Sequence, residues 1–89
     1  MIFIKRLSEI LDYDFDFSNF LSDDDEITNA AVTITPSGLI PGVMLYSTKI
    51  VKQYVSGGID ATDFTLTATI QTTLNRTKEL DIIIRILGS

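Results

Sequence analysis

Strict alternation of apolar and acidic side chains over residues 11–17 constrains the fold of this chain more than any other feature. The segment reads Leu-Asp-Tyr-Asp-Phe-Asp-Phe. Successive side chains of a β-strand point to opposite faces, so a strand would place the apolar residues on one face and the aspartates on the other. A helix would scatter both sets around its circumference. The pattern therefore predicts a strand with one buried face and one solvated face.

Two later segments, residues 29–35 and 64–72, repeat this alternation. Their outward positions are mostly threonine, whose branched Cβ suits a pleated surface. Together with the first segment and the last strand, they predict an inner row that forms the core between two sheets. This core row is Tyr13, Phe15, Phe17, Val32, Phe64, Leu66, Ile70, Ile82 and Ile84.

The last expected strand, residues 77–87, carries apolar side chains on both faces. Its even-numbered positions from Leu80 onward are apolar, as a half-buried strand requires. Ile83 and Leu87 interrupt the polar character of the other face. Either this strand is central and covered on both faces, or its outer face carries a contact patch.

The middle of the chain has weaker signals. Pro41-Gly42 reads as a break, and residues 43–46 and 50–55 predict two short strands around a turn. Residues 18–22 are the only helical candidate and allow at most one turn. No convincing amphipathic helix is present.

Six to seven short strands spaced about a dozen residues apart predict an all-β fold, an immunoglobulin-like antiparallel β-sandwich. A chain of 89 residues has room for one domain. We expect a single soluble sandwich over residues 8–89. Residues 1–7 precede it as an N-terminal arm or an added edge strand.

The amino-acid composition argues against catalysis or metal binding by this chain. Cysteine and histidine are both absent, which removes disulfides, thiolate ligands and the usual neutral-pH base. The acidic loop at residues 23–26 is the best calcium candidate, but it lacks the glycine and ligand spacing of a calcium loop. We therefore expect no enzyme, no cofactor and no metal site.

The charge and hydropathy pattern also limits the partners. A net charge of −5 would repel a phosphate backbone, so we expect no nucleic acid. No apolar run approaches the roughly 20 residues of a membrane span, so we expect no membrane contact. Other proteins remain as the expected partners.

Several short motifs occur along the chain in a fixed order. They are Leu11 to Leu21, Asp25-Glu26-Ile27, Pro36-Ser37-Gly38-Leu39, Ser56-Gly57-Gly58, Phe64-Thr65-Leu66, Thr72-Thr73 and Asn75-Arg76. With these motifs the chain resembles, over nearly its whole length, a known family, the short immunoglobulin-like structural proteins of tailed phages.

The chain departs from the family pattern at three aromatic positions. Phe17 and Phe20 stand where the family usually has tryptophan, and Phe64 stands where it has tyrosine. A tyrosine at that corner hydrogen-bonds back to the chain, which phenylalanine cannot do. We expect packing and turn bonds of Asp60 or Asp63 to hold the corner instead.

The resemblance implies a virion structural protein, made in the host cytoplasm and located in the virion. The first reading is a capsid decoration or cement protein, with the major capsid protein as partner and a possible homo-oligomer on the particle. The alternative is an accessory domain of the neck or tail. A reading from a different class is an adhesive immunoglobulin-like binding module.

The N-terminal segment is the expected partner contact. Residues 1–7 combine large apolar side chains with two positive charges on an otherwise acidic chain. An exposed apolar terminus is usually covered, either by the chain's own sheet or by a neighbouring protein. The candidate partner-binding residues are Ile2, Phe3, Ile4, Lys5, Arg6, Ile83 and Leu87.

Overall fold

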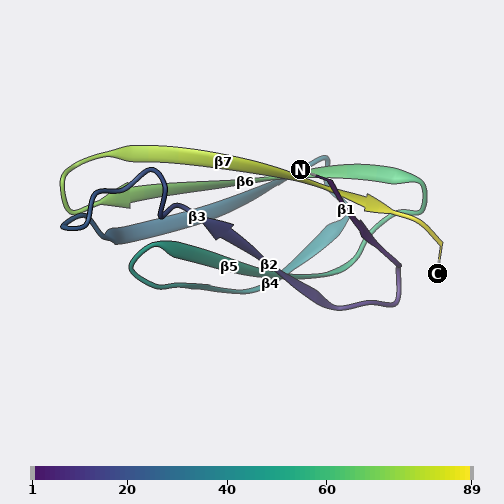
Figure 1. The fold of residues 1–89 in the computed structure, drawn as a ribbon. Helices are drawn as coiled ribbons and strands as arrows, with labels where there is room; N and C mark the ends of the chain where they lie inside the picture. The colour runs from purple at the N-terminus through teal and green to yellow at the C-terminus, as the bar shows by residue number, and fades with distance from the viewer. Residues whose placement is uncertain (1, 89) are drawn as a thin grey trace.

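Two β-sheets stacked face to face, with the loops that join their strands, make up the fold of the described residues, 2–88 of a computed structural model (Figure 1). One sheet has the strand order β1-β7-β6-β3 and the other has the order β2-β5-β4. The predicted all-β sandwich of six to seven strands is confirmed, and residues 2–88 form seven strands and no helix. The strands are β1 (Ile2–Lys5), β2 (Leu11–Asp16), β3 (Ile27–Thr35), β4 (Leu39–Tyr46), β5 (Ile50–Gly57), β6 (Thr62–Thr72) and β7 (Thr77–Ile86). Residues 2–88 contain no membrane-spanning helix.

One strand pairing differs from the predicted antiparallel arrangement. β1 runs parallel to β7, whereas all the other pairings are antiparallel. Parallel neighbours need a long connection between them. Here the connection is the rest of the sandwich, because β1 and β7 are the first and last strands.

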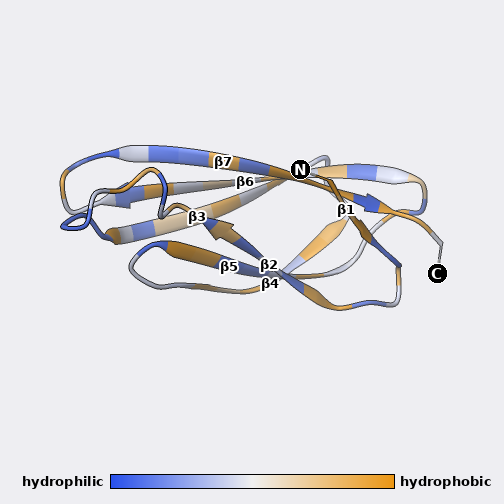
Figure 2. Ribbon diagram, in the orientation of Figure 1, coloured by the Kyte–Doolittle hydropathy of each residue, from blue (hydrophilic) through white to orange (hydrophobic). Residues whose placement is uncertain are grey.

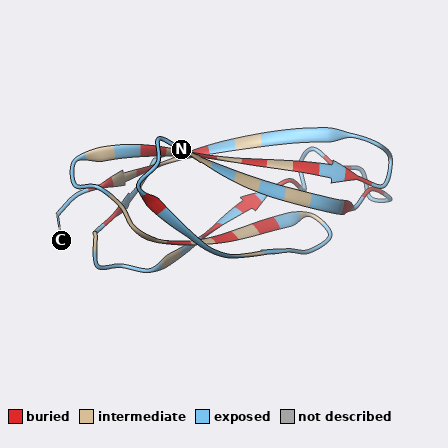
Figure 3. Ribbon diagram, turned by 180° about the vertical axis from the view of Figure 1, so that it is seen from behind, coloured by how far each residue is buried: buried red, intermediate tan, exposed pale blue. Residues whose placement is uncertain are grey.

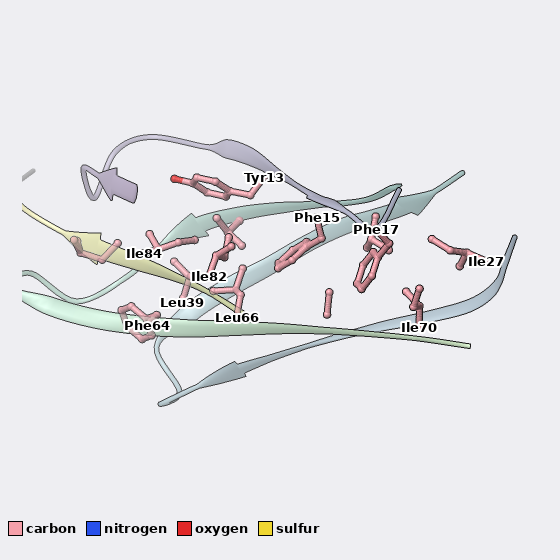
Figure 4. Close-up of a cluster of buried hydrophobic side chains, with 14 of the residues drawn as sticks. Tyr13, Phe15, Phe17, Ile27, Leu39, Phe64, Leu66, Ile70, Ile82 and Ile84 are labelled. Atoms are coloured by element: carbon pink, nitrogen blue, oxygen red, sulfur yellow. The ribbon is translucent and has the colours of Figure 1, made fainter. Parts of the chain in front are cut away.

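The core lies between the sheets where the alternation predicted it (Figure 4). Buried and less buried residues alternate along the strands (Figure 3). Eight of the nine residues in the predicted core row are buried, and Val32 is half-buried and packs against the others. Phe17 is fully buried although it lies one residue beyond the end of β2.

The segment around Pro41-Gly42 is a strand and not a break. β4 runs through both residues, and its register against β5 shifts between Pro41 and Met44. Proline is tolerated here because β4 is an edge strand, where a missing N–H donor is not needed. The buried Gln53 side chain supports this bulge, donating to Gly42 O at 3.1 Å and to Tyr54 O at 2.7 Å.

The helical candidate at residues 18–22 is a non-helical turn. The Phe20 N–H donates to Phe17 O, and the Ser18 N–H donates to Asp16 Oδ1 at 2.9 Å. The aspartate side chain therefore competes with helix formation by supplying a local acceptor.

The corner at Phe64 is held by packing, as predicted, but the aspartate side chains there bond to the end of the chain and not within the turn. Phe64 is fully buried, and its side chain has no hydroxyl group that could bond back to the chain. Asp60 Oδ1 accepts from the Gly88 N–H at 2.8 Å, and Asp63 pairs with Arg85. These bonds tie the end of the chain to the start of β6.

Candidate interaction surfaces

The N-terminal segment is an edge strand whose side chains point alternately in and out. Ile2 lies beside Ile83 and Lys5 lies beside Ile86 in the register of β1 with β7. The Ile2 and Ile4 side chains are exposed, with 63% of Ile4 accessible. Phe3 and Lys5 point into the sandwich. β1 is thus largely hydrophobic (Figure 2), and its two exposed isoleucines give it an apolar outer face.

The Phe3 and Lys5 side chains pack inside the fold, so they are not exposed for the expected contact with a partner protein. The Phe3 ring packs against Tyr13 with centroids 4.9 Å apart. Lys5 is fully buried, and its Nζ donates to Gly57 O at 2.7 Å and to Arg6 O at 2.8 Å. Desolvation lowers the pKa of Lys5, and the charge of Glu9 partly opposes this. Both side chains anchor β1 to the sandwich.

The other predicted contact residues lie on the surface. Ile83 is half-buried on the outer face of β7, and Leu87 and Arg6 are exposed. The backbone N–H of Arg6 donates to Glu9 Oε1 at 2.7 Å. The N-terminal patch is defined here as Ile2, Ile4, Ile83 and Leu87.

A bidentate ion pair lies beside this patch. Arg85 Nε and Nη2 donate to the Asp63 carboxylate at 2.9 and 3.1 Å. The hydrogen bonds from Arg85 lower the pKa of Asp63. The pair therefore stays charged and gives the patch a fixed polar border.

A second apolar surface lies on the three-stranded sheet and was not predicted from the sequence. The β4 patch is defined as Ile40, Val43, Leu45 and Ile50, all of which are exposed. A shallow pocket of about 350 Å³ opens beside it, lined by Asp14, Leu45, Tyr46, Ser47, Ile50 and Lys52. The available signal was that β4 is apolar at nearly every position, without the alternation of a half-buried strand.

Charges border the β4 patch as well. Lys52 Nζ lies 3.2 Å from Asp12 Oδ2 and 3.8 Å from Asp14 Oδ1. The hydrogen bond with Asp12 and the charges of both aspartates raise the pKa of Lys52. The outward aspartates of β2 thus form a solvated, partly neutralised face, as their alternation predicts.

The acidic loop has a structural role. Asp25 is fully buried, and its Oδ1 accepts from the Thr73 hydroxyl at 3.0 Å and the Leu74 N–H at 3.2 Å. Arg76 Nη1 lies 3.9 Å from Asp25 Oδ2. Desolvation raises the pKa of Asp25, but these hydrogen bonds and the Arg76 charge outweigh it and hold the pKa below its usual value. Asp25 therefore joins its loop to the β6–β7 hairpin as an anion.

The two apolar patches lie on opposite faces of the molecule. The N-terminal patch is on the outer face of the four-stranded sheet, and the β4 patch is on the outer face of the three-stranded sheet. The molecule is elongated, measuring 43 × 19 × 18 Å. One patch can therefore contact a partner while the other remains accessible.

A small sandwich that exposes apolar residues on both outer faces has the features of a protein-interaction module, because such surfaces are usually covered by another protein. A family model narrows this class. The model for Gp77, described as podophage GP4 fiber-tail adaptor protein gp77, matches residues 5–85, and the chain belongs to this family. It is a phage structural protein and a component of the virion, assembled after synthesis in the host cytoplasm. No curated protein matches the chain.

The family corrects the expected position within the virion. Capsid decoration, the first reading of the sequence, is not supported, and neither is the major capsid protein as the partner. The alternative of a tail accessory domain agrees better with the family description. The motifs behind the first reading are structural, and a fold does not specify where its protein is mounted.

Proposed function

We propose that this chain is a non-enzymatic tail adaptor, a small virion protein that connects a fiber to the tail of a podophage. The observation that carries the proposal is the family match, which spans residues 5–85. The matched region includes nearly all of the sandwich and both sheets. The proposed partners are one tail protein and one fiber protein.

The two patches on opposite faces support this role, because an adaptor needs two separate contacts. Each patch contains four aliphatic residues. Burying one such side chain stabilises a complex by about 1.5–3 kcal/mol before the costs of association. Contacts of this size suit an accessory protein that is added during assembly.

The residues proposed for the first contact are those of the N-terminal patch, with Arg6 at its border. Arg6 is exposed and carries a positive charge on a chain with a net charge of −5. A partner surface with apolar side chains and a nearby carboxylate would fit this arrangement. The β4 patch is proposed as the second contact.

The test uses particles assembled without this chain, to which purified protein is added. Two double variants remove one patch each: Ile2→Ser with Ile4→Ser, and Val43→Thr with Leu45→Thr. The matched control is Ala31→Ser with Thr33→Ser on the exposed face of β3. Binding of the chain to the particle and attachment of fibers are measured separately, by sedimentation and by electron microscopy.

Wild-type and control proteins are expected to restore fibers. One patch variant should fail to bind the particle, and the other should bind without carrying a fiber. Particles that lack the chain but carry a full set of fibers would show that it is not the adaptor. Patch variants that attach fibers as well as the control would place the two contacts elsewhere.

A further inference from the structure

Half of one edge of β7 has no strand beside it. β1 pairs with β7 only from Ile83 to Ile86. The first part of β7, residues 77–82, pairs with β6 on one side and with no strand of residues 2–88 on the other. The vacant length is six residues, or about 20 Å of extended chain.

The backbone polar groups of this half-edge point outward. The Leu87 N–H donates to Lys5 O on the β1 side, and Ile86 O accepts from the Ala61 N–H on the β6 side. Backbone groups of successive strand residues point to alternate sides, so the odd-numbered residues of β7 face the β1 side. Glu79 and Asp81 therefore direct their N–H and C=O groups to the vacant edge, where an added strand could bond to them.

An apolar groove lies under this edge. It has a volume of about 320 Å³ and is lined by Asp14, Phe15 and Asp16 of β2 and by Leu80, Asp81 and Ile82 of β7. Phe15 and Ile82 project into the interior between the sheets (Figure 4). The groove thus has an apolar floor, and its rim carries Asp81 of β7 on one side and the outward-facing Asp14 and Asp16 of β2 on the other.

The negative charge of the groove rim favours a positively charged binding segment. Lys52 lies 3.8 Å from Asp14 and offsets part of one negative charge. Asp16 accepts hydrogen bonds from Ser18, which lower its pKa and keep it ionised. A second copy of this chain would bring its own carboxylates against these, and charged edges of this kind prevent such self-pairing. A segment with positive side chains would be attracted.

We infer that the vacant half of β7 receives an extended segment of a partner virion protein with alternating apolar and basic side chains. The segment pairs with Glu79 and Asp81 as an added strand. Its apolar side chains cover Leu80 and Ile82, and its lysines or arginines lie on the outer face of the sheet, beside the side chains of Glu79 and Asp81. This mode of recognition takes affinity from main-chain bonds and selectivity from alternate side chains. The inference rests on the proposed adaptor function and specifies how one partner is held.

The first test uses the purified full chain, labelled with ¹⁵N, and a synthetic peptide. The probe is acetyl-Thr-Lys-Val-Lys-Val-Lys-Val-Thr-amide, and its control carries glutamate in place of every lysine. We expect the amide resonances of Glu79 and Asp81 to shift and to gain protection from hydrogen exchange. The lysine peptide should bind about tenfold more tightly than the control, and less tightly at high salt.

Two charge reversals separate the groove from the general charge of the protein. Asp81→Lys changes the rim, and Asp23→Lys makes the same change of charge on an exposed loop outside it; both positions are exposed, so both variants should fold. Asp81→Lys is expected to weaken the peptide about fivefold or more, and Asp23→Lys to have little effect. Equal weakening by both variants, shifts confined to β4, or no binding of the lysine peptide would overturn the inference.

The same variants are then added to particles that lack the chain. Loss of fiber attachment with Asp81→Lys, but not with Asp23→Lys, is expected. Full attachment with Asp81→Lys would overturn the docking site and leave the adaptor function in place. A different result would contradict the adaptor function itself: particles that carry fibers although no form of the chain was added.

Discussion

β4 and β6 show that apolar character does not by itself determine which strand is buried. β4 is apolar along most of its length, yet only its first residue, Leu39, is buried. β6 is rich in threonine, yet it buries every second residue from Phe64 to Thr72. β6 lies between β7 and β3, whereas β4 is an edge strand with a bulge. The period of the pattern and the position in the sheet therefore decide burial, and apolar residues that do not fit the period remain available to a partner.

The largest expected difference between the two strands is in the cost of truncating a side chain. Phe64→Ala in β6 should lower the free energy of unfolding by about 3–5 kcal/mol, because it leaves a cavity in the packed interior. Urea unfolding followed by circular dichroism measures this. The matched control is Thr65→Ala on the outer face of the same strand. A Phe64→Ala protein as stable as this control would mean that β6 does not carry the core.

The bulge gives a second, smaller difference. Gln53→Ala should destabilise the domain by about 1–3 kcal/mol, because the part-buried hydrogen bonds from this side chain to the carbonyl groups of Gly42 and Tyr54 are lost. Hydrogen exchange should rise first along β4, while β6 stays protected. Lys52→Ala, on the outer face of the same strand, is the control. Equal loss of protection in β4 and β6 would indicate that the bulge is not a separate weak point.

As the pH falls, the end of β6 should lose stability before β4 does. The pKa of Asp25 is lowered in the folded protein, so its contribution to stability is present above the ordinary aspartate pKa and is lost as the pH falls through the folded value. We expect the urea midpoint to fall below about pH 4. The Leu74 amide, which donates to Asp25, should lose protection in the same range.

The control for this titration is a change in the same loop. Asp25→Asn should reduce the dependence of the urea midpoint on acid, and Asp23→Asn, at an exposed position, should leave it unchanged. An Asp25→Asn protein with the full acid dependence would assign the effect to other carboxylates, such as Asp63.

The smallest expected change in stability belongs to the β4 patch. Leu45→Thr should alter the free energy of unfolding by no more than about 0.5 kcal/mol, because the side chain is already exposed. Its effect should appear only in fiber attachment to particles. A loss of stability comparable to that of Phe64→Ala would show that Leu45 is packed in solution, and the contrast between β4 and β6 would not hold.

The sequence predicted the elements whose side chains follow one period throughout. β2, β6 and β7 alternate without interruption over their inner faces, and these strands supply most of the core. The alternation could also have predicted the inward position of Lys5. Lys5 is two residues from Phe3, so the same period places it on the inner face, but a charged residue is not expected there without a partner. Its partner, the carbonyl of Gly57, is 52 residues away.

The remaining features depend on contacts between distant parts of the chain. Asp25 reads as one of several loop aspartates, and only the β6–β7 hairpin, 48 or more residues later, distinguishes it. Pro41-Gly42 reads as a turn because the local signal is the same for a turn and for a bulge at a sheet edge. The vacant half of β7 follows from where β1 begins along it, which depends on the pairing of the two ends of the chain.

The parallel pairing of β1 with β7 also determines how the domain would respond to tension. Ile2 lies beside Ile83, and both strands run in the same direction from there (Figure 1). A pull on the two ends of the chain would therefore slide the strands past each other along their length. The backbone hydrogen bonds between them would be loaded together, whereas in an antiparallel hairpin pulled at its open end they would be loaded one at a time. The pairing that closes this sandwich is thus also its point of resistance to force.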